Sequence, residues 1–182
     1  MWHNQGVSRA SAPRRPAPPL DAPALERLAL RYVERFATSR GKLTHYLARK
    51  IRERGWEGPP ADPAAVAERM AQAGYVDDRG FAEQKGAALA RRGYGARRVA
   101  ETLRAAGLAE EDSATVLEEA RAAALDNALR LARRRRIGPY AEERPDPRQR
   151  ERHIAALLRA GHDMTTARRV VDSAPGDIPQ PE

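Results

Sequence analysis

The chain has 182 residues, a formal net charge of +8 and no cysteine, and aromatic residues make up only 5% of it. Disulfides and thiolate metal sites are therefore excluded, and no apolar run is long enough to cross a membrane. The basic N-terminus lacks the apolar stretch of a secretory signal, so we expect a cytoplasmic protein with no membrane partner.

A repeat of helical units organises the chain. Four short helical runs each end at a glycine, and in each run the residues eight and four positions before the glycine lie on one face of the helix. The glycines are Gly55, Gly74, Gly107 and Gly161. Glycine just past a helix end supplies the left-handed conformation that closes it. We predict an all-α protein, an elongated tandem array of three three-helix modules, each burying its apolar face partly against its neighbours.

Residues 1–20 are rich in proline and arginine and predict a disordered basic arm. Module 1 is expected over residues 21–75. Its first helix carries an apolar stripe that includes Tyr32 and Phe36, which we expect in the core. Polar residues that stand before the three apolar stripes are the expected N-caps: Asp21, Ser39 and Asp62.

Module 2 is expected over residues 76–120. Asp77 is the predicted cap of its first helix, with Phe81 in the core. Gly95 precedes the middle helix, which stops at Gly107. The third helix should run from about Glu110 to Ala120.

Module 3 is expected over residues 121–174, with a frayed tail over 175–182. Its first helix has an apolar stripe that leads into four arginines, and a proline-rich loop follows at residues 138–147. The stripe consists of Leu125, Ala128, Leu129 and Ala132. The later helices carry Met164 and other apolar residues on their inner faces. No segment alternates with a period of two, so no sheet is expected.

Charge is sorted by helix. The middle helix of each module is basic, whereas residues 110–119 are acidic, and this sorting favours a basic track for a polyanion or an acidic protein face. A solvated helix surface would look similar, and arginines at a helix end also suit the helix dipole. The candidate contacts to a partner or to DNA are Arg40, Lys42, Arg49, Lys50, Arg91, Arg92, Arg97, Arg98, Arg133, Arg134, Arg135, Arg136, Arg148 and Arg152.

Motifs for catalysis are absent. No two histidines stand four residues apart, and neither a GxGxxG nor a P-loop pattern occurs. Asp77 and Asp78 suit a helix start better than an acid pair. We therefore expect no enzyme, metal or cofactor. Tyr75 should pack back against the helix before it, and a base-stacking platform is not expected with so few aromatic residues.

Residues 74–82 resemble the hallmark of the RecX family, bacterial regulators of the RecA recombinase. The matching residues include Gly74, Tyr75, Asp77, Asp78 and Phe81. Two further segments are similar to family motifs, and the resemblance covers about residues 24–173. Their residues are Ser39, Arg40, Leu43 and Leu47 in the first, and Gly93, Gly95, Arg97, Arg98, Val99, Leu103 and Gly107 in the second.

The resemblance implies tandem three-helix repeats that dock along the groove of the RecA–DNA filament. Such proteins modulate RecA, mainly as inhibitors, in recombination, DNA repair and SOS activities, and some also bind single- or double-stranded DNA. We expect a monomer whose hallmark residues have structural roles. Gly74 should allow the chain to turn, Asp77 should cap the next helix and Phe81 should pack in the core. A basic helical DNA- or RNA-binding protein that acts without RecA remains the alternative, and a helical scaffold is a third interpretation.

Overall fold

The structure is a computed structural model that describes residues 18–180, and the expected arm up to residue 17 lies outside them. Within residues 18–180 the chain forms nine α-helices and one short 3₁₀-helix, and no strand. The one β-type contact in this range is an isolated bridge between Leu20 and Trp56. The predicted all-α class is confirmed.

The first three helices are α1 (Ala22–Val33), α2 (Arg40–Arg54) and α3 (Pro63–Gln72). Each begins at the predicted cap, where a side-chain oxygen accepts a backbone N–H three residues on. The distances are 2.8 Å at Asp21, 3.2 Å at Ser39 and 2.9 Å at Asp62. Their inward faces form one buried cluster together with one residue before α1 and one after α3: Leu20, Leu25, Ala29, Leu43, Leu47, Val66, Ala67 and Val76.

The next three helices are α4 (Asp78–Arg91), α5 (Ala96–Ala105) and α6 (Glu110–Ala122). Asp77 caps α4 as predicted, since its Oδ1 accepts the Gly80 N–H at 2.9 Å. Phe81 is buried, and a second cluster joins the three helices through Ala82, Val99, Leu103, Val116 and Ala120.

The last group consists of α7 (Ala124–Arg135), η1 (Gly138–Tyr140), α8 (Pro147–Arg159) and α9 (Met164–Asp172). Asp146 and Gln149 form a reciprocal capping box at the start of α8. A third cluster holds this group together through Ala128, Leu131, Ala132, Ile137, Ile154, Leu157, Ala160, Ala167, Val170 and Val171.

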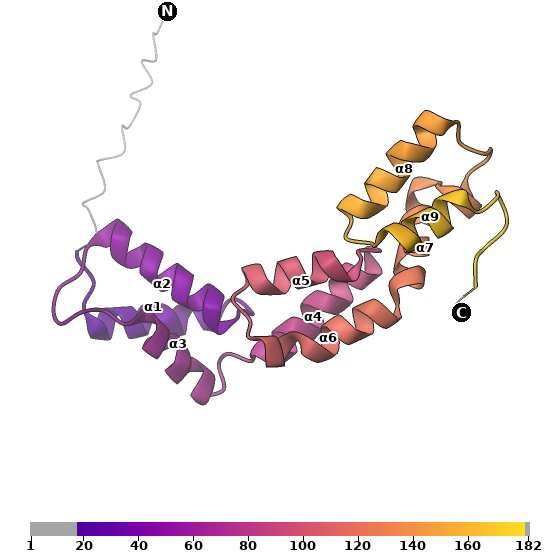
Figure 1. The fold of residues 1–182 in the computed structure, drawn as a ribbon. Helices are drawn as coiled ribbons and strands as arrows, with labels where there is room; N and C mark the ends of the chain where they lie inside the picture. Colours follow the sequence, from indigo (N-terminus) through magenta and orange to yellow (C-terminus); the bar gives the residue numbers. More distant parts are fainter. Residues whose placement is uncertain (1–17, 181–182) are drawn as a thin grey trace, which may run out of the picture.

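The three helix groups lie in a row, and the third tilts away from the line of the first two (Figure 1). Helices α2, α5 and α8 follow one side of this row, and we call them the middle-helix row. Successive members meet end to end, with the C-terminus of one helix against the N-terminus of another. These two contacts, α5 to α2 and α8 to α5, are here called joints.

The two joints are built alike. In the first, the Ser39 hydroxyl, at the N-cap of α2, donates to the Ala106 carbonyl at the C-cap of α5, at 2.5 Å. In the second, the Gly95 N–H, at the N-cap of α5, donates to the Ala160 carbonyl at the C-cap of α8, at 3.0 Å. Each joint therefore satisfies helix-end groups of one module with those of the next.

Four sequence expectations are wrong, and local structure explains each. Phe36 lies beyond the end of α1 and is 52% exposed. Tyr75 is 53% exposed, because the residue that packs into the core after Gly74 is Val76 instead. Met164 is the first residue of α9 and lies at the surface. Leu131, which the predicted stripe omitted, takes a core place, whereas Leu125 and Leu129 are only partly buried.

The predicted boundaries shift at three places. Leu20 belongs to the first core rather than to the arm, because it is fully buried beside Trp56. The predicted loop at 138–147 contains η1, and its last residue, Pro147, already opens α8. In the tail, the Gly176 N–H donates to the Pro139 carbonyl at 2.8 Å, so its first residues are held against η1.

Candidate interaction surface

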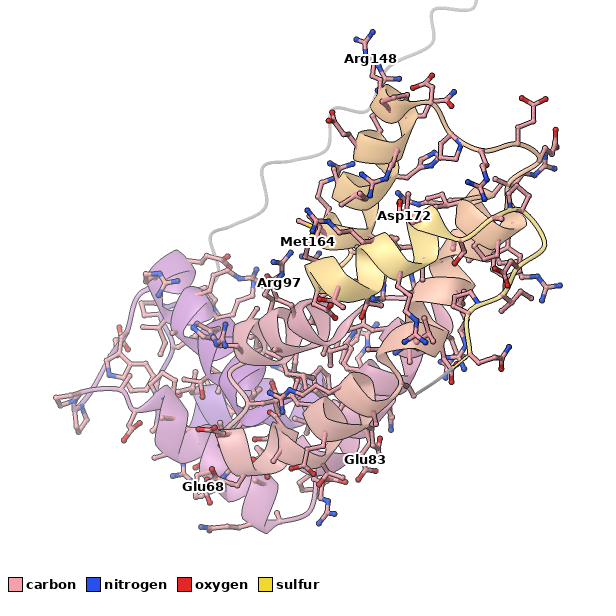
Figure 2. The ribbon with its side chains drawn as sticks, turned by 45° about the vertical axis from the view of Figure 1, so that its right-hand side comes forward. Glu68, Glu83, Arg97, Arg148, Met164 and Asp172 are labelled. Atoms are coloured by element: carbon pink, nitrogen blue, oxygen red, sulfur yellow. The ribbon has the colours of Figure 1, made fainter. Side chains whose placement is uncertain are left out.

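Basic side chains crowd the outer face of the middle-helix row. In Figure 2, Arg148 of α8 lies at the upper end of the view and Arg97 of α5 near its middle, while Glu68 and Glu83 lie along its lower side. Arg97, Arg148 and Arg152 are exposed. The side chain of Arg49, on α2, is 57% exposed. The row thus presents cations from all three modules on one elongated surface.

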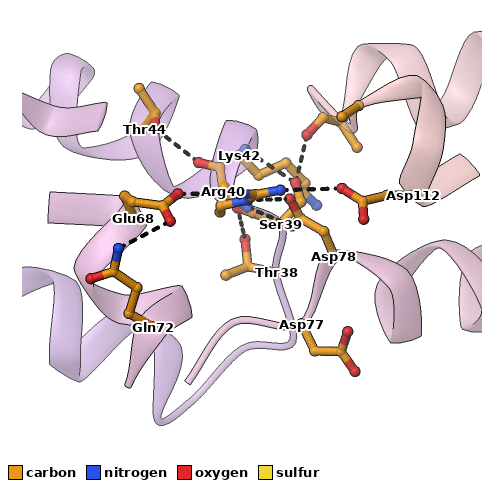
Figure 3. Close-up of polar contacts among 12 residues, drawn as sticks. Thr38, Ser39, Arg40, Lys42, Thr44, Glu68, Gln72, Asp77, Asp78 and Asp112 are labelled. Carbon is orange, nitrogen blue, oxygen red and sulfur yellow. Dashed lines mark hydrogen bonds and ion pairs between the residues drawn. The ribbon is translucent and has the colours of Figure 1, made fainter. Parts of the chain in front are cut away.

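Arg40 differs from the other candidates because carboxylates of this chain surround its guanidinium (Figure 3). Its Nε donates to Asp78 at 2.8 Å, Nη1 to Glu68 at 3.1 Å and Nη2 to Asp112 at 3.2 Å. The hydrogen bond that the Arg40 guanidinium donates to Asp78 is the main cause that raises the pKa of Arg40 above its ordinary value. Arg40 therefore ties module 1 to module 2 at the first joint.

Sequence reasoning placed Asp78 beside a helix cap and missed its role at the joint. The Asp78 side chain is only 5% exposed and also accepts the Arg40 backbone N–H at 2.8 Å. Two more carboxylates, Glu68 and Asp112, come from α3 and α6. These partners lie 28 and 72 residues from Arg40 in the sequence, so the local periodicity of the chain could not predict these contacts.

Four candidates on α2 and α5 form short-range ion pairs at the surface. Arg49 and Lys50 both contact Glu53, at 3.5 and 2.6 Å. Arg97 and Arg98 both contact Glu101, at 3.9 and 3.4 Å. Because exposed pairs of this kind contribute at most about 1 kcal/mol, Arg49, Lys50 and Arg98 can exchange a glutamate for a ligand at small cost. Arg97 differs, since its guanidinium also donates to the Leu158 carbonyl of α8 across the second joint.

The arginines at the ends of α4 and α7 form a second group. Arg134 donates to the Arg92 carbonyl at 2.9 Å, which brings the two helix ends together. Arg136 closes α7 in a left-handed conformation, with φ of 54°, and pairs with Glu142 at 3.2 Å. The side chains of Arg134 and Arg136 therefore have different partners, and the run of four arginines at residues 133–136 does not form one site.

Several candidates have no ion pair or side-chain hydrogen bond within residues 18–180. These are Lys42, Arg91, Arg133, Arg135, Arg148 and Arg152. Lys42 lies 5.3 Å from the centre of the Phe81 ring, and the five arginines are exposed. Such cations are free to meet an anionic partner.

A groove of about 510 Å³ runs beside α2 in module 1 and reaches the C-terminal end of α5. Its walls are Tyr32, Lys42, His45, Tyr46, Arg49, Arg52 and Ala105. Only Lys42 and Arg49 of these were candidates from the sequence. The signal for the others was present, because Lys42, His45, Arg49 and Arg52 recur every three or four residues and so share one face of α2.

Two absences bear on function and hold for the described part of the chain. No group of three or more histidine, aspartate or glutamate side chains there could hold a metal ion. None of its helices combines the length and the apolar character that a membrane span requires.

A regulatory protein RecX from Myxococcus xanthus is 31% identical over 161 residues, which are 83% of this chain and 86% of the relative. The chain belongs to the RecX family. A RecX protein from Stenotrophomonas maltophilia is 36% identical over 72% of this chain and 77% of its own length. No family model matches. The relatives are named as regulatory proteins, and this chain is accordingly a RecX-type regulator.

Two crystal structures of RecX proteins share the fold. The RecX of Lactobacillus salivarius matches with a TM-score of 0.56 over 81% of this chain and 92% of that one. A second regulatory protein RecX matches with a TM-score of 0.62 over 83% and 75% of the two chains. Both are only 14% identical in sequence, so the likeness concerns the helical architecture alone.

Proposed function

We propose that this RecX-type protein binds the RecA–DNA filament and lowers RecA activity in recombination, DNA repair and the SOS response. In this proposal it acts in the cytoplasm as a monomer, without catalysis or a cofactor. The observation that carries the proposal is the middle-helix row. Helices α2, α5 and α8 contain 15, 10 and 13 residues, about 55 Å of helix in total, and expose cations from one end to the other.

An elongated basic surface suits a partner that repeats along an axis. A filament offers the same acidic or phosphate groups at regular intervals, and an array of similar modules can meet several of them at once. Joints that fix the modules to one another add to affinity, because less conformational freedom is lost on binding.

The test is single-stranded-DNA-dependent ATP hydrolysis by the cognate RecA, titrated with this protein. Inhibition well below one molecule per RecA protomer is expected. The double variant Arg148→Glu, Arg152→Glu should weaken inhibition at least about tenfold, because it reverses two exposed cations of the row that have no partner within the described residues.

A matched control also reverses two arginine charges, but outside the middle-helix row. Arg27→Glu, Arg31→Glu alters two exposed arginines of α1, spaced four residues apart like Arg148 and Arg152 but outside the middle-helix row, and should inhibit like the wild type. Circular dichroism should show unchanged helicity in both. No inhibition at equimolar protein, together with tight salt-sensitive binding to bare DNA, would instead identify a nucleic-acid-binding protein that acts without RecA.

A further inference from the structure

The second joint contains a pocket of about 320 Å³ that both of its modules line. Module 2 contributes Ala96 and Arg97 of α5 and Arg121 of α6, and module 3 contributes His162, which lies between α8 and α9. Arg97 and Met164, the first residue of α9, mark the two modules at this joint in Figure 2. A molecule that fills the pocket therefore touches both modules.

Module 2 supplies this pocket with hydrogen-bond donors that the fold does not use. Arg121 is exposed and has no ion pair or side-chain hydrogen bond within residues 18–180. Arg97 donates to the Leu158 carbonyl and its Nε lies 3.9 Å from Glu101, which leaves further guanidinium donors. Ala96 begins α5, which no side chain caps, and its N–H has no partner in the described chain. Two guanidinium groups and a free N–H at a helix start favour an anion.

Module 3 supplies a buried acceptor. The His162 side chain is 3% exposed, and its Nε2 lies 3.0 Å from the Gly93 carbonyl. The neutral ring that donates from Nε2 keeps a lone pair on Nδ1, and Nδ1 has no hydrogen-bond partner among the described residues. A buried acceptor without a partner is costly, so a ligand gains affinity by donating a hydrogen bond to it.

We propose that this pocket binds a phosphate group that keeps one hydroxyl, as inorganic phosphate does at neutral pH. Arg97, Arg121 and the Ala96 N–H hold its unprotonated oxygens, and its hydroxyl donates to Nδ1 of His162. The bound group links module 2 to module 3 and stabilises the second joint. This site goes beyond the proposed regulation of RecA, because it needs neither RecA nor DNA.

Other anions match the pocket less well. Sulfate and side-chain carboxylates satisfy the arginines but carry no hydroxyl at neutral pH, and a phosphodiester of a nucleic-acid backbone lacks it too. Asp163 also lines the pocket, but its two oxygens accept from the Thr166 N–H and hydroxyl, at 2.7 Å each. Two arginines and this aspartate leave a net charge of +1, which suits a monoanion such as dihydrogen phosphate.

The test titrates the full chain with inorganic phosphate at constant ionic strength and follows the Ala96 amide and Nδ1 of His162 by NMR. His162→Gln identifies the ring signal. Both signals should shift and saturate together. Sulfate and dimethyl phosphate should bind about fivefold more weakly or less, since neither donates to His162. Equal binding of sulfate and phosphate would overturn the proposal.

The role of the cations is tested with a matched pair of variants. Arg121→Gln should weaken phosphate binding about fivefold, because it removes a charged donor. Arg91→Gln also removes an exposed arginine from the last turn of a helix, but outside the pocket, and should bind like the wild type. Equal weakening in both variants would mean that phosphate responds only to the net charge of the chain, and the proposal would fail.

Hydrogen exchange tests the link between the modules. The N–H groups of Gly95 and Arg97 donate to the Ala160 and Gly161 carbonyls across the joint. Phosphate at about ten times its dissociation constant should slow their exchange about tenfold, because only the closed joint holds the site. The amide of Leu47 in module 1 should be unaffected. Unchanged exchange at Gly95 and Arg97 would contradict a phosphate that bridges the modules.

Adenosine monophosphate distinguishes two sources of the phosphate group, since its monoanion also keeps one hydroxyl. Tighter binding of this monoester than of inorganic phosphate would identify a nucleotide as the ligand, and weaker binding would identify the free ion. All of these measurements omit RecA, so their outcome is independent of the proposed regulation.

Discussion

Arg40 joins module 1 to module 2 through Asp78 and Asp112 and also pairs with Glu68 of its own module, although its sequence context suggested a contact for a partner. Replacement by methionine keeps an unbranched chain but removes the guanidinium. The nearly buried carboxylate of Asp78 then retains only the backbone N–H of residue 40. We expect Arg40→Met to lower the free energy of unfolding by about 2–3 kcal/mol, measured by urea denaturation.

A double-mutant cycle tests the cause of that loss. Adding Asp78→Asn to Arg40→Met removes the uncompensated charge, so the double variant should be no less stable than Arg40→Met alone. A change of less than about 0.5 kcal/mol in Arg40→Met would mean that the bridge is merely an exposed ion pair.

We expect His162 to make the second joint sensitive to pH. The side chain is 3% exposed, its Nε2 lies 3.0 Å from the Gly93 carbonyl, and its Nδ1 has no hydrogen-bond partner within the described residues. Burial lowers the pKa of His162, while the Gly93 carbonyl and Asp163 oppose that shift. The neutral ring, with Nε2–H donating to Gly93, is therefore the form that the fold favours.

Because the pKa of His162 is lower in the folded than in the unfolded chain, its contribution is fully present above about pH 6.5 and is lost as the pH falls. Urea denaturation at pH 7 and pH 5 should show lower stability at pH 5. His162→Gln keeps a donor for Gly93 and should reduce this difference. The pKa of Asp163 is lowered, so its titration lies below this window. An equal pH dependence in both proteins would assign the effect to other groups.

At the scale of helices, the beginning and end of each helix could be predicted from the sequence, whereas the contacts between helices of different modules could not. Caps such as Ser39 and Asp77 and closing glycines act within a few residues, and their signals are local. Gly41 and Gly95 carry no such signal, because their role is to let another module approach. Phe36 followed the helical spacing of the stripe, but α1 had already ended at Val33.

Gly41 is essential for the close approach at the first joint. A Cβ built on Gly41 would lie 2.6 Å from Cα of Gly107 and 2.7 Å from the Ala106 carbonyl oxygen, and neither backbone atom can rotate away. In an isolated helix Gly→Ala stabilises by roughly 1 kcal/mol. We expect Gly41→Ala to destabilise the protein instead, by about 1–3 kcal/mol, because the modules must move apart.

Thermal denaturation followed by circular dichroism checks the sign of this change. A higher melting temperature in Gly41→Ala would show that the joint is loose in solution and that only helix propensity matters.

At the scale of the molecule, class and repeat could be predicted from the sequence, but the row of middle helices could not. Each joint depends on hydrogen bonds between residues more than 60 positions apart, such as the one from the Ser39 hydroxyl to the Ala106 carbonyl, and composition does not encode them. The groove escaped prediction for a similar reason, since Tyr32 and Tyr46 stack across two helices.

Both ends of the middle-helix row are covered by the chain itself. At the C-terminus of α2, the Leu20 N–H donates to the Gly55 carbonyl at 3.0 Å, and the Arg54 guanidinium donates to the Pro18 carbonyl at 2.7 Å. At the N-terminus of α8, the capping box of Asp146 and Gln149 satisfies the first N–H groups. In the described chain the array therefore presents no open joint, which is how terminal repeats limit stacking.

Separate cores joined by narrow contacts should unfold in stages. Leu157 is fully buried in the third cluster, and Leu157→Ala should cost about 2–5 kcal/mol there. Because each module contacts only its neighbour, the loss should stay in module 3. Hydrogen exchange should then accelerate in α8 and α9, while the amides of Leu43 and Leu47 in α2 stay protected. Leu47→Ala should give the reverse pattern. Uniform loss of protection in either variant would show instead that the joints couple the three cores into one cooperative unit.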